Sequence, residues 1–280
     1  MAIYDANDTR LDVYQVGTPA IVQQAAAVAL VISEDDLVDN GDGTFSPAAV
    51  VFGQRTELVT GDPALLCPNQ AFLAQPSAEE AYGTAWLVNS TLTNGLVVTA
   101  KHVLEAALSH DPLNNLRFAF AWAMTSATTP VRIPGANIYT AGQVVAVGAG
   151  NGIKDDWALI EVTAPVAGIP PLPLSAQNPQ MNQALYCLSY PTQLPLKYST
   201  GWVNDVTAPE LFRGPVTAFG GSSGAPVLDA ATRTVQGVYV HGPVDYEVAG
   251  PCVVASNYPS NDVTEAGRMI RVQQFQGSIP

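Results

Sequence analysis

The sequence predicts an all-β protein built from many short strands. Its 23 glycines and 22 prolines are scattered among short runs rich in Val, Thr and Tyr, so no long helical pattern develops. The apolar runs 84–88 and 96–100 flank a polar turn containing Asn94-Gly95, a pattern typical of a β-hairpin. With 280 residues, 48% of them hydrophobic and 12% charged, the chain can bury a sizeable core, as one large unit or as two packed subdomains.

The expected elements follow one another along the whole chain. A weak helical pattern at 19–27 leads into a strand at 28–32, and the turn signal DNGDG at 39–43 separates that strand from another at 48–52. This turn resembles the start of a calcium-binding loop, but the closing Glu of such a loop is missing, so we interpret it as a turn. Further strand-like runs lie at 117–122, 143–147, 157–162, 184–189, 225–228 and 235–241.

A proline-rich stretch at 169–174 is the best candidate for an internal linker. Proline cannot donate a backbone hydrogen bond to a sheet, and it favours an extended chain. We therefore predict two subdomains. Residues 1–175 hold an N-terminal extension and the first half of the fold, and residues 176–280 hold the second half and a C-terminal segment.

Charge and composition limit the partners and the compartment. A net charge of −13 repels nucleic-acid phosphates and acidic membranes, so we expect neither as a partner. The apolar stretch 20–32 contains two glutamines and is too short to span a bilayer. No secretory leader precedes it, which favours a cytoplasmic protein or, alternatively, a secreted mature form that has lost its leader. Cys67, Cys187 and Cys252 form no metal-site pattern and no dense disulfide framework, so we expect reduced, buried thiols.

Three short motifs carry side chains suited to acyl transfer. In GGSSGAPV at 220–227, glycines let a substrate carbonyl approach the backbone N–H groups closely. In VVTAKHVL at 97–104, a strand ends at His102, and histidine is the residue type best suited to proton transfer near neutral pH. In DDWALI at 155–160, Asp156 precedes an apolar strand and is a candidate to orient that imidazole. Each motif alone is compatible with a turn or packing role, but their order His, Asp, Ser along the chain favours one site that contains all three residues.

These motifs resemble those around the catalytic triad of the trypsin/chymotrypsin-like serine protease superfamily. The shared patterns are Thr-Ala-x-His, Asp-x-Ala-Leu and Gly-x-Ser-Gly-x-Pro, in the family's order. The sequence is most similar to bacterial V8-like (glutamyl endopeptidase-like) proteases, through GTAWLV at 83–88 and GVYVHG at 237–242. The resemblance covers about 82–242. It implies a chymotrypsin-like double antiparallel β-barrel with the active site in the cleft between the barrels.

Residue by residue, the resemblance assigns the catalytic roles. Ser223 is the nucleophile, His102 the general acid and base, and Asp156 its partner, whereas Asp155 lies outside the motif. His102 and Asp156 would belong to the first barrel and Ser223 to the second. The backbone N–H groups of Gly221 and Ser223 would form the oxyanion hole.

Two departures from the family pattern matter. Ser222 precedes the nucleophile where trypsin-like zymogens have the Asp that pairs with a new amino terminus, so we do not expect that activation route. Lys101 replaces a small residue beside His102, and we expect its ammonium group to point to solvent.

The substrate pocket is less clearly specified. By resemblance, four residues approach the side chain that precedes the scissile bond: Thr217, Ala218, Tyr239 and Gly242. Thr217 occupies the position of the trypsin carboxylate and supplies none, so trypsin-like specificity does not transfer. Tyr239 stands where glutamate-specific relatives have a histidine, and His241 comes two residues later, so glutamate specificity does not transfer either. Asp245 and Glu247 either reach into the pocket to favour Arg or Lys or are solvated loop charges, and we favour the second interpretation.

We therefore predict a serine endopeptidase that hydrolyses peptide bonds through an acyl-enzyme on Ser223, acting on a protein or peptide without a cofactor or metal. Two alternatives stay open. A pseudoprotease would keep the barrels and only hold a peptide in the cleft, although the complete triad argues against it. A regulated protease would act on one protein delivered by a regulatory protein partner.

Overall fold

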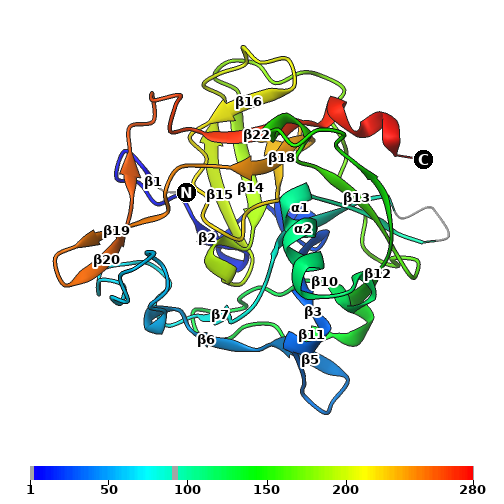
Figure 1. Ribbon diagram of the computed structural model, residues 1–280, viewed down its shortest axis with the longest axis horizontal. Coiled ribbons are helices and arrows are strands. Elements are labelled where there is room, and N and C mark those ends of the chain that lie inside the picture. Colours follow the sequence, from blue (N-terminus) through cyan, green and yellow to red (C-terminus); the bar gives the residue numbers. More distant parts are fainter. Residues whose placement is uncertain (1–2, 90–93, 280) are drawn as a thin grey trace.

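The computed structural model describes residues 3–89 and 94–279, and these residues form an almost entirely β structure (Figure 1). Residues 90–93, at the tip of the predicted hairpin, lie outside the described residues. The α-helices are α1 (Pro19–Ala25) and α2 (Lys101–His110), and α1 confirms the helical pattern predicted at 19–27. Within the described ranges, neither helix is long and apolar enough to cross a membrane.

The first half of the chain forms a closed barrel in the order β10-β12-β13-β9-β8-β3. Its strands are β3 (Val28–Ser33), β8 (Gly83–Asn89), β9 (Leu96–Thr99), β10 (Leu116–Phe120), β12 (Ile138–Val147) and β13 (Ala158–Val162). The predicted hairpin is confirmed, because β8 pairs antiparallel with β9 in a register that places Trp86 opposite Val98. All of β3 is buried in the apolar core, which accounts for its continuous hydrophobic run.

The second half forms a seven-stranded sheet in the order β16-β22-β18-β17-β14-β15-β2. Its strands are β2 (Leu11–Asp12), β14 (Ala184–Ser189), β15 (Lys197–Trp202), β16 (Leu211–Gly214), β17 (Pro226–Asp229), β18 (Val235–His241) and β22 (Gly267–Arg271). The N-terminal strand β2 pairs with β15, so part of the extension belongs to this sheet and not to the barrel. The subdomain boundary between residues 175 and 176 stays a prediction.

Smaller sheets complete the described structure. They pair β1 (Ile3–Tyr4) with β21 (Asn257–Tyr258), β5 (Thr44–Pro47) with both β4 (Leu37–Asp39) and β11 (Ile133–Pro134), β6 (Ala49–Val51) with β7 (Pro76–Ala78), and β19 (Tyr246–Ala249) with β20 (Cys252–Ala255). The turn predicted at 39–43 therefore joins β4 to β5.

The apolar core connects the barrel to the second sheet. Trp122, which follows β10, stacks on Tyr190, which follows β14, with ring centroids 6.2 Å apart, and both side chains are buried. In the proline-rich stretch, Leu172 is buried and its N–H donates to the carbonyl of Leu87 in β8 at 3.0 Å. The connection thus packs along the barrel wall.

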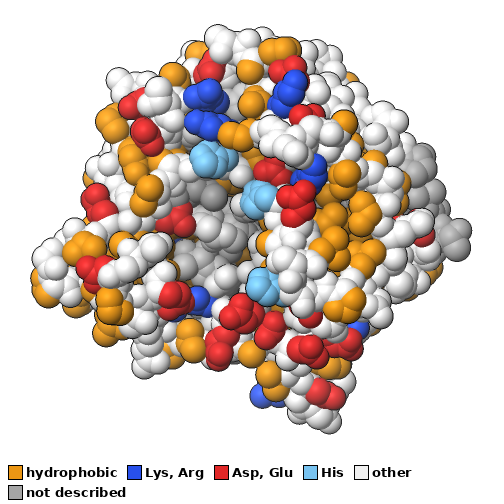
Figure 2. Space-filling model, viewed as in Figure 1, with side chains coloured by type: hydrophobic (Ala, Val, Ile, Leu, Met, Phe, Trp, Pro, Cys, Tyr) orange, Lys and Arg blue, Asp and Glu red, His pale blue; other side chains and the backbone are white. Residues whose placement is uncertain are grey.

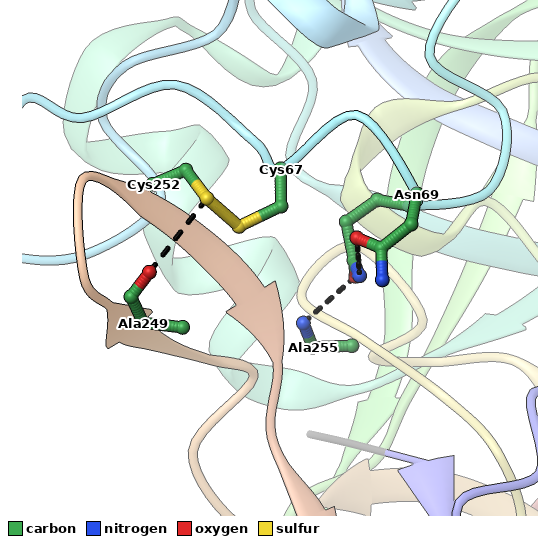
Figure 3. Close-up of a disulfide and its surroundings, with 6 residues drawn as sticks. Cys67, Asn69, Ala249, Cys252 and Ala255 are labelled. Carbon is green, nitrogen blue, oxygen red and sulfur yellow. Dashed lines mark hydrogen bonds between the residues drawn. A yellow bond between two sulfur atoms is a disulfide. The ribbon is translucent and has the colours of Figure 1, made fainter.

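Cys67 and Cys252 form a disulfide, which corrects the expectation of reduced thiols (Figure 3). Their Cα atoms are 5.0 Å apart although 185 positions separate them in the sequence. Backbone hydrogen bonds from Cys67 to Val253 and from Val253 to Leu65, both 2.9 Å, bring the two segments together. Cys187 is free and buried, and burial raises the pKa of its thiol to about 12. The sequence spacing could not reveal the pairing, because it depends on how β20 docks beside residues 65–67.

Candidate active site

His102 and Asp156 meet at the ends of two paired strands. His102 is the second residue of α2, just after β9, and Asp156 lies two residues before β13. Because Thr99 is opposite Ala158 in the β9–β13 register, the two residues emerge at the same end of the barrel. Asp156 Oδ2 is 2.6 Å from His102 Nδ1, and Asp156 Oδ1 accepts a hydrogen bond from the His102 backbone N–H at 2.8 Å. A carboxylate partner places the ring hydrogen on Nδ1 and leaves Nε2 as the basic atom.

Asp155 faces a different part of the chain. A Cβ on Gly150 would lie 2.2 Å from Asp155 Oδ2, so the Asp155 carboxylate lies against this glycine. A Cβ on Gly148 would lie 1.9 Å from the Asp155 carbonyl oxygen, a backbone clash that requires glycine at this position. The ammonium group of Lys101 donates to the carbonyl of Gly150 at 3.0 Å, and the side chain is only 17% exposed. The expectation that Lys101 points to solvent was wrong, because this loop presents carbonyl acceptors to it.

Ser223 lies in a tight turn between Phe219 and β17. Gly221 and Gly224 on either side of it both have a φ of +87°, a conformation that residues with a side chain rarely adopt. A Cβ on Gly224 would lie 2.1 Å from the carbonyl oxygen of Thr84. The Thr84 N–H donates to the Ser223 carbonyl at 2.9 Å, so β8 of the barrel holds this turn of the second sheet.

Two backbone N–H groups of this turn are left for a ligand. Within residues 3–89 and 94–279, neither the Gly221 N–H nor the Ser223 N–H donates to an acceptor of the chain. The Thr192 N–H donates to the Gly220 carbonyl at 2.5 Å. The Gly220 C=O and the Gly221 N–H belong to one peptide, and in a trans peptide these groups point in opposite directions. The hydrogen bond to Thr192 therefore turns the Gly221 N–H away from Thr192. Two such N–H groups beside a serine hydroxyl can stabilise an oxyanion.

His102 and Ser223 line one open cleft together with the chain that follows β18. The other lining residues are Leu58, Val240, His241, Gly242, Pro243, Val244 and Asp245. Figure 2 shows this face of the molecule hollowed, with histidine side chains around the hollow. The structure therefore brings the Ser223 hydroxyl, the His102 imidazole and an open surface to one place.

The residues predicted for the substrate pocket fall into two groups. His241, Gly242 and Asp245 line the cleft. Thr217, Ala218 and Tyr239 are at most 2% exposed and are not among the residues of the described structure that line it. Thr217 instead lines a separate hollow beside the N-terminal segment, and Tyr239 packs on Gly267 of β22.

The end of β18 presents His241 to the cleft, and the loop after β18 presents Asp245. Asp245 Oδ2 accepts a hydrogen bond from the Gly220 N–H at 2.7 Å, so our preference for a solvated Asp245 was wrong, whereas Glu247 is exposed. Burial lowers the pKa of His241, and the positive charge of Arg268 lowers it further. Sequence reasoning missed four lining residues: Leu58, Val240, Pro243 and Val244. Leu58 lies far from the others in sequence, so only the fold brings it to the cleft.

Comparisons with known proteins agree with this geometry. A family model described as "Trypsin-like peptidase domain" matches residues 83–238, more than half of the chain, including His102, Asp156 and Ser223. The chain therefore belongs to the trypsin-like peptidase family and is a serine protease. No curated protein matches it in sequence.

Solved protease structures share the fold at low sequence identity. A Glu endopeptidase in complex with MPD has a TM-score of 0.56 and 12% identity, covering 100% of this chain and 97% of that chain. The VesB protease of Vibrio cholerae has a TM-score of 0.53 and 10% identity, and the match covers 97% of this chain and 66% of that chain. The active form of the Rv3671c protease from M. tuberculosis has a TM-score of 0.52 and 15% identity, and the match covers 99% of this chain and 88% of that chain. The chymotrypsin-like β-barrel fold expected from the sequence is confirmed, as is its likeness to glutamyl endopeptidases.

Proposed function

We propose that this protease is an endopeptidase that forms an acyl-enzyme on Ser223, with His102 as general acid and base and Asp156 as its orienting partner. The observation that carries the proposal is the 2.6 Å contact between His102 Nδ1 and Asp156 Oδ2 beside a cleft that Ser223 also lines. The N–H groups of Gly221 and Ser223, which have no acceptor in the described chain, support it.

In the first half-reaction, Ser223 Oγ attacks the carbonyl carbon of the scissile peptide while its proton passes to His102 Nε2. The carbonyl oxygen becomes an oxyanion, which the N–H groups of Gly221 and Ser223 stabilise. Asp156 stabilises the imidazolium and does not itself take a proton. The C–N bond then breaks, His102 returns the proton to the leaving amine, and the acyl group stays on Ser223.

The second half-reaction repeats these steps with water. Water attacks the ester carbon, His102 takes its proton, and the C–O bond to Ser223 breaks as the proton returns to Ser223 Oγ. The carboxylic acid leaves and the enzyme is regenerated. Every proton is carried by one imidazole.

Digestion of a peptide library derived from a whole proteome tests this function directly. The wild-type protein should cut peptides, the Ser223→Ala variant should lose nearly all of that activity, and Ser109→Ala should keep it, because Ser109 is an exposed residue of α2 outside the site. A folded wild-type protein that leaves every peptide intact would favour a pseudoprotease. Selective cutting of one protein, with the library left uncut, would favour a partner-delivered substrate.

We also propose that the protein works in an oxidising compartment, which favours the secreted alternative over the cytoplasmic one. The Cys67–Cys252 disulfide motivates this, because such bonds persist mainly in oxidising environments. The measurement is peptide mapping of protein alkylated at the moment of cell lysis. A linked Cys67–Cys252 peptide supports the proposal, and two alkylated thiols contradict it.

A further inference from the structure

A buried arginine from the N-terminal segment lies beside the turn that carries the nucleophile. Arg10 precedes β2, and its side chain is 3% exposed. Asp8 accepts hydrogen bonds from its Nε at 2.9 Å and its Nη2 at 2.7 Å. Burial disfavours the charged form, but the adjacent Asp8 outweighs burial and raises the pKa of Arg10, so the guanidinium stays charged. The proposed chemistry gives this buried cation no role.

The guanidinium of Arg10 packs on an aromatic pair. Its Cζ lies 3.9 Å from the centroid of the Phe219 ring, and Phe219 packs against Tyr246 with ring centroids 5.2 Å apart. A cation over an aromatic face is attracted to it, most strongly when water is excluded, as it is here. Phe219 directly precedes Gly220, so Arg10 restrains the beginning of the nucleophile turn.

Tyr246 extends this restraint to the peptide between Gly220 and Gly221. Its hydroxyl is 3.0 Å from Thr192 Oγ1. Thr192 has a φ of +52°, which is uncommon for a residue with a side chain and persists only where surrounding contacts hold it. In that conformation the Thr192 N–H donates to the Gly220 carbonyl, which directs the Gly221 N–H to the opposite side.

We propose that Arg10 is a positioning residue for the oxyanion hole. It holds Phe219 and Tyr246 so that the Gly220–Gly221 peptide keeps the orientation that presents the Gly221 N–H to the substrate oxyanion. Ser222 stands where trypsin-like zymogens have the Asp that pairs with the new amino terminus after activation, and here a cation from the N-terminal segment stabilises the same turn through Phe219. This inference rests on the proposed acyl-transfer function.

Steady-state kinetics on a cleaved peptide provide the first test, with the variants Arg10→Ala and Arg10→Lys. We expect kcat to fall about 100-fold in Arg10→Ala, as for loss of one oxyanion donor, with KM nearly unchanged. Arg10→Lys should be intermediate, because a lysine keeps the charge but not the planar group. Methylguanidinium added at millimolar concentration should restore part of the kcat of Arg10→Ala, a rescue that a general loss of stability would not show.

The matched control is Arg271→Met. Arg271 is also a buried arginine, but its hydrogen bonds go to the carbonyls of Val206, Ala208 and Leu211, none of which belongs to the nucleophile turn. This variant should lower thermal stability and leave kcat close to the wild-type value. The proposal is overturned if folded Arg10→Ala keeps kcat within twofold of wild type, or if Arg271→Met loses as much kcat.

Hydrogen exchange of the peptide that covers residues 218–226 gives a second readout, which does not require activity. Exchange in this segment should accelerate in Arg10→Ala and stay unchanged in Arg271→Met. If the wild-type protein hydrolyses no peptide, the proposed function fails, and the exchange data still decide whether Arg10 orders the turn. Unchanged exchange in Arg10→Ala would overturn the positioning role whether or not the enzyme is active.

Discussion

Asp156 holds His102 through two separate contacts, one to Nδ1 of the ring at 2.6 Å and one to the backbone N–H at 2.8 Å. The backbone contact is available because His102 lies in the first turn of α2, where N–H groups have no acceptor within the helix. One carboxylate therefore satisfies an N–H at the start of the helix and orients the imidazole, so the imidazole and the helix that carries it are positioned together.

The Asp156→Asn variant should lose about four orders of magnitude in kcat, because an amide no longer fixes the ring hydrogen on Nδ1. KM should change little, since Asp156 does not touch the substrate in this mechanism. Asp155→Asn is the matched control, and steady-state peptide hydrolysis by both variants is the measurement. If Asp156→Asn is as active as Asp155→Asn, Asp156 does not orient His102 for catalysis.

The Gly221→Ala variant should lower kcat by about two to three orders of magnitude, the usual effect of losing an oxyanion donor. Its Cβ would lie 2.5 Å from the Tyr190 carbonyl oxygen and 3.2 Å from the Gln193 nitrogen, so the Gly220–Gly221 peptide must move. Gly168→Ala makes the same change at a φ of +77° with nothing within 4 Å. The Gly168→Ala control should be slightly less stable than wild type, with an unchanged kcat. A wild-type kcat in Gly221→Ala would exclude the Gly221 N–H from the oxyanion hole.

Thiol titration should count the free cysteines. Native protein should not react with a thiol reagent, because Cys187 is buried and its pKa is raised to about 12, and unfolded protein should show one thiol per chain. Replacing both Cys67 and Cys252 by Ser should lower the free energy of unfolding by about 2–5 kcal/mol, measured by urea denaturation. Three thiols in unfolded, unreduced protein would contradict the disulfide.

Lys197 should make stability depend on pH above neutrality. Its Nζ is buried 2.6 Å from Asp12 Oδ1, and burial lowers the pKa of Lys197 to about 8, well below the 10.5 of an exposed lysine. Between these values the unfolded chain binds more protons, so the free energy of unfolding should rise with pH by up to about 1.4 kcal/mol per pH unit.

The control for this pH dependence is the double variant Lys197→Met with Asp12→Asn, which avoids leaving one charge buried without its partner. Urea denaturation at pH 7.5 and pH 9.5 should show a larger increase for wild type than for the double variant. Equal increases would mean that Lys197 is protonated throughout this range.

Local sequence patterns predicted many of the strands and the motif residues, because both depend on neighbours in the chain, but they missed β15, β16 and β22 of the second sheet. The buried runs at β3, β8 and β9 needed only their own hydrophobicity. The order His102, Asp156, Ser223 needed only the resemblance. The Cys67–Cys252 bond, the insertion of Arg10 beside Phe219 and the contact of Asp245 with Gly220 each join segments that are far apart in sequence. Such pairings follow from tertiary packing, which no local pattern encodes.

The substrate pocket likewise depends on tertiary packing that the sequence did not reveal. Position by position, the resemblance placed Thr217 and Tyr239 beside the substrate, but both are buried, and the loop from His241 to Asp245 forms the cleft wall instead. This loop leads into β19 and β20, and β20 is joined by the Cys67–Cys252 disulfide to a segment 185 positions away in the sequence. The sequence near the serine motif could not specify such an arrangement.

The most direct test of the central claim is mass spectrometry of the protein after reaction with a fluorophosphonate. The account predicts one phosphonyl adduct per chain, located on Ser223 by peptide mapping and absent from Ser223→Ala. It also predicts much slower labelling in His102→Ala, because the serine then lacks its base. A folded wild-type protein that stays unlabelled, or an adduct on a residue other than Ser223, would contradict the account.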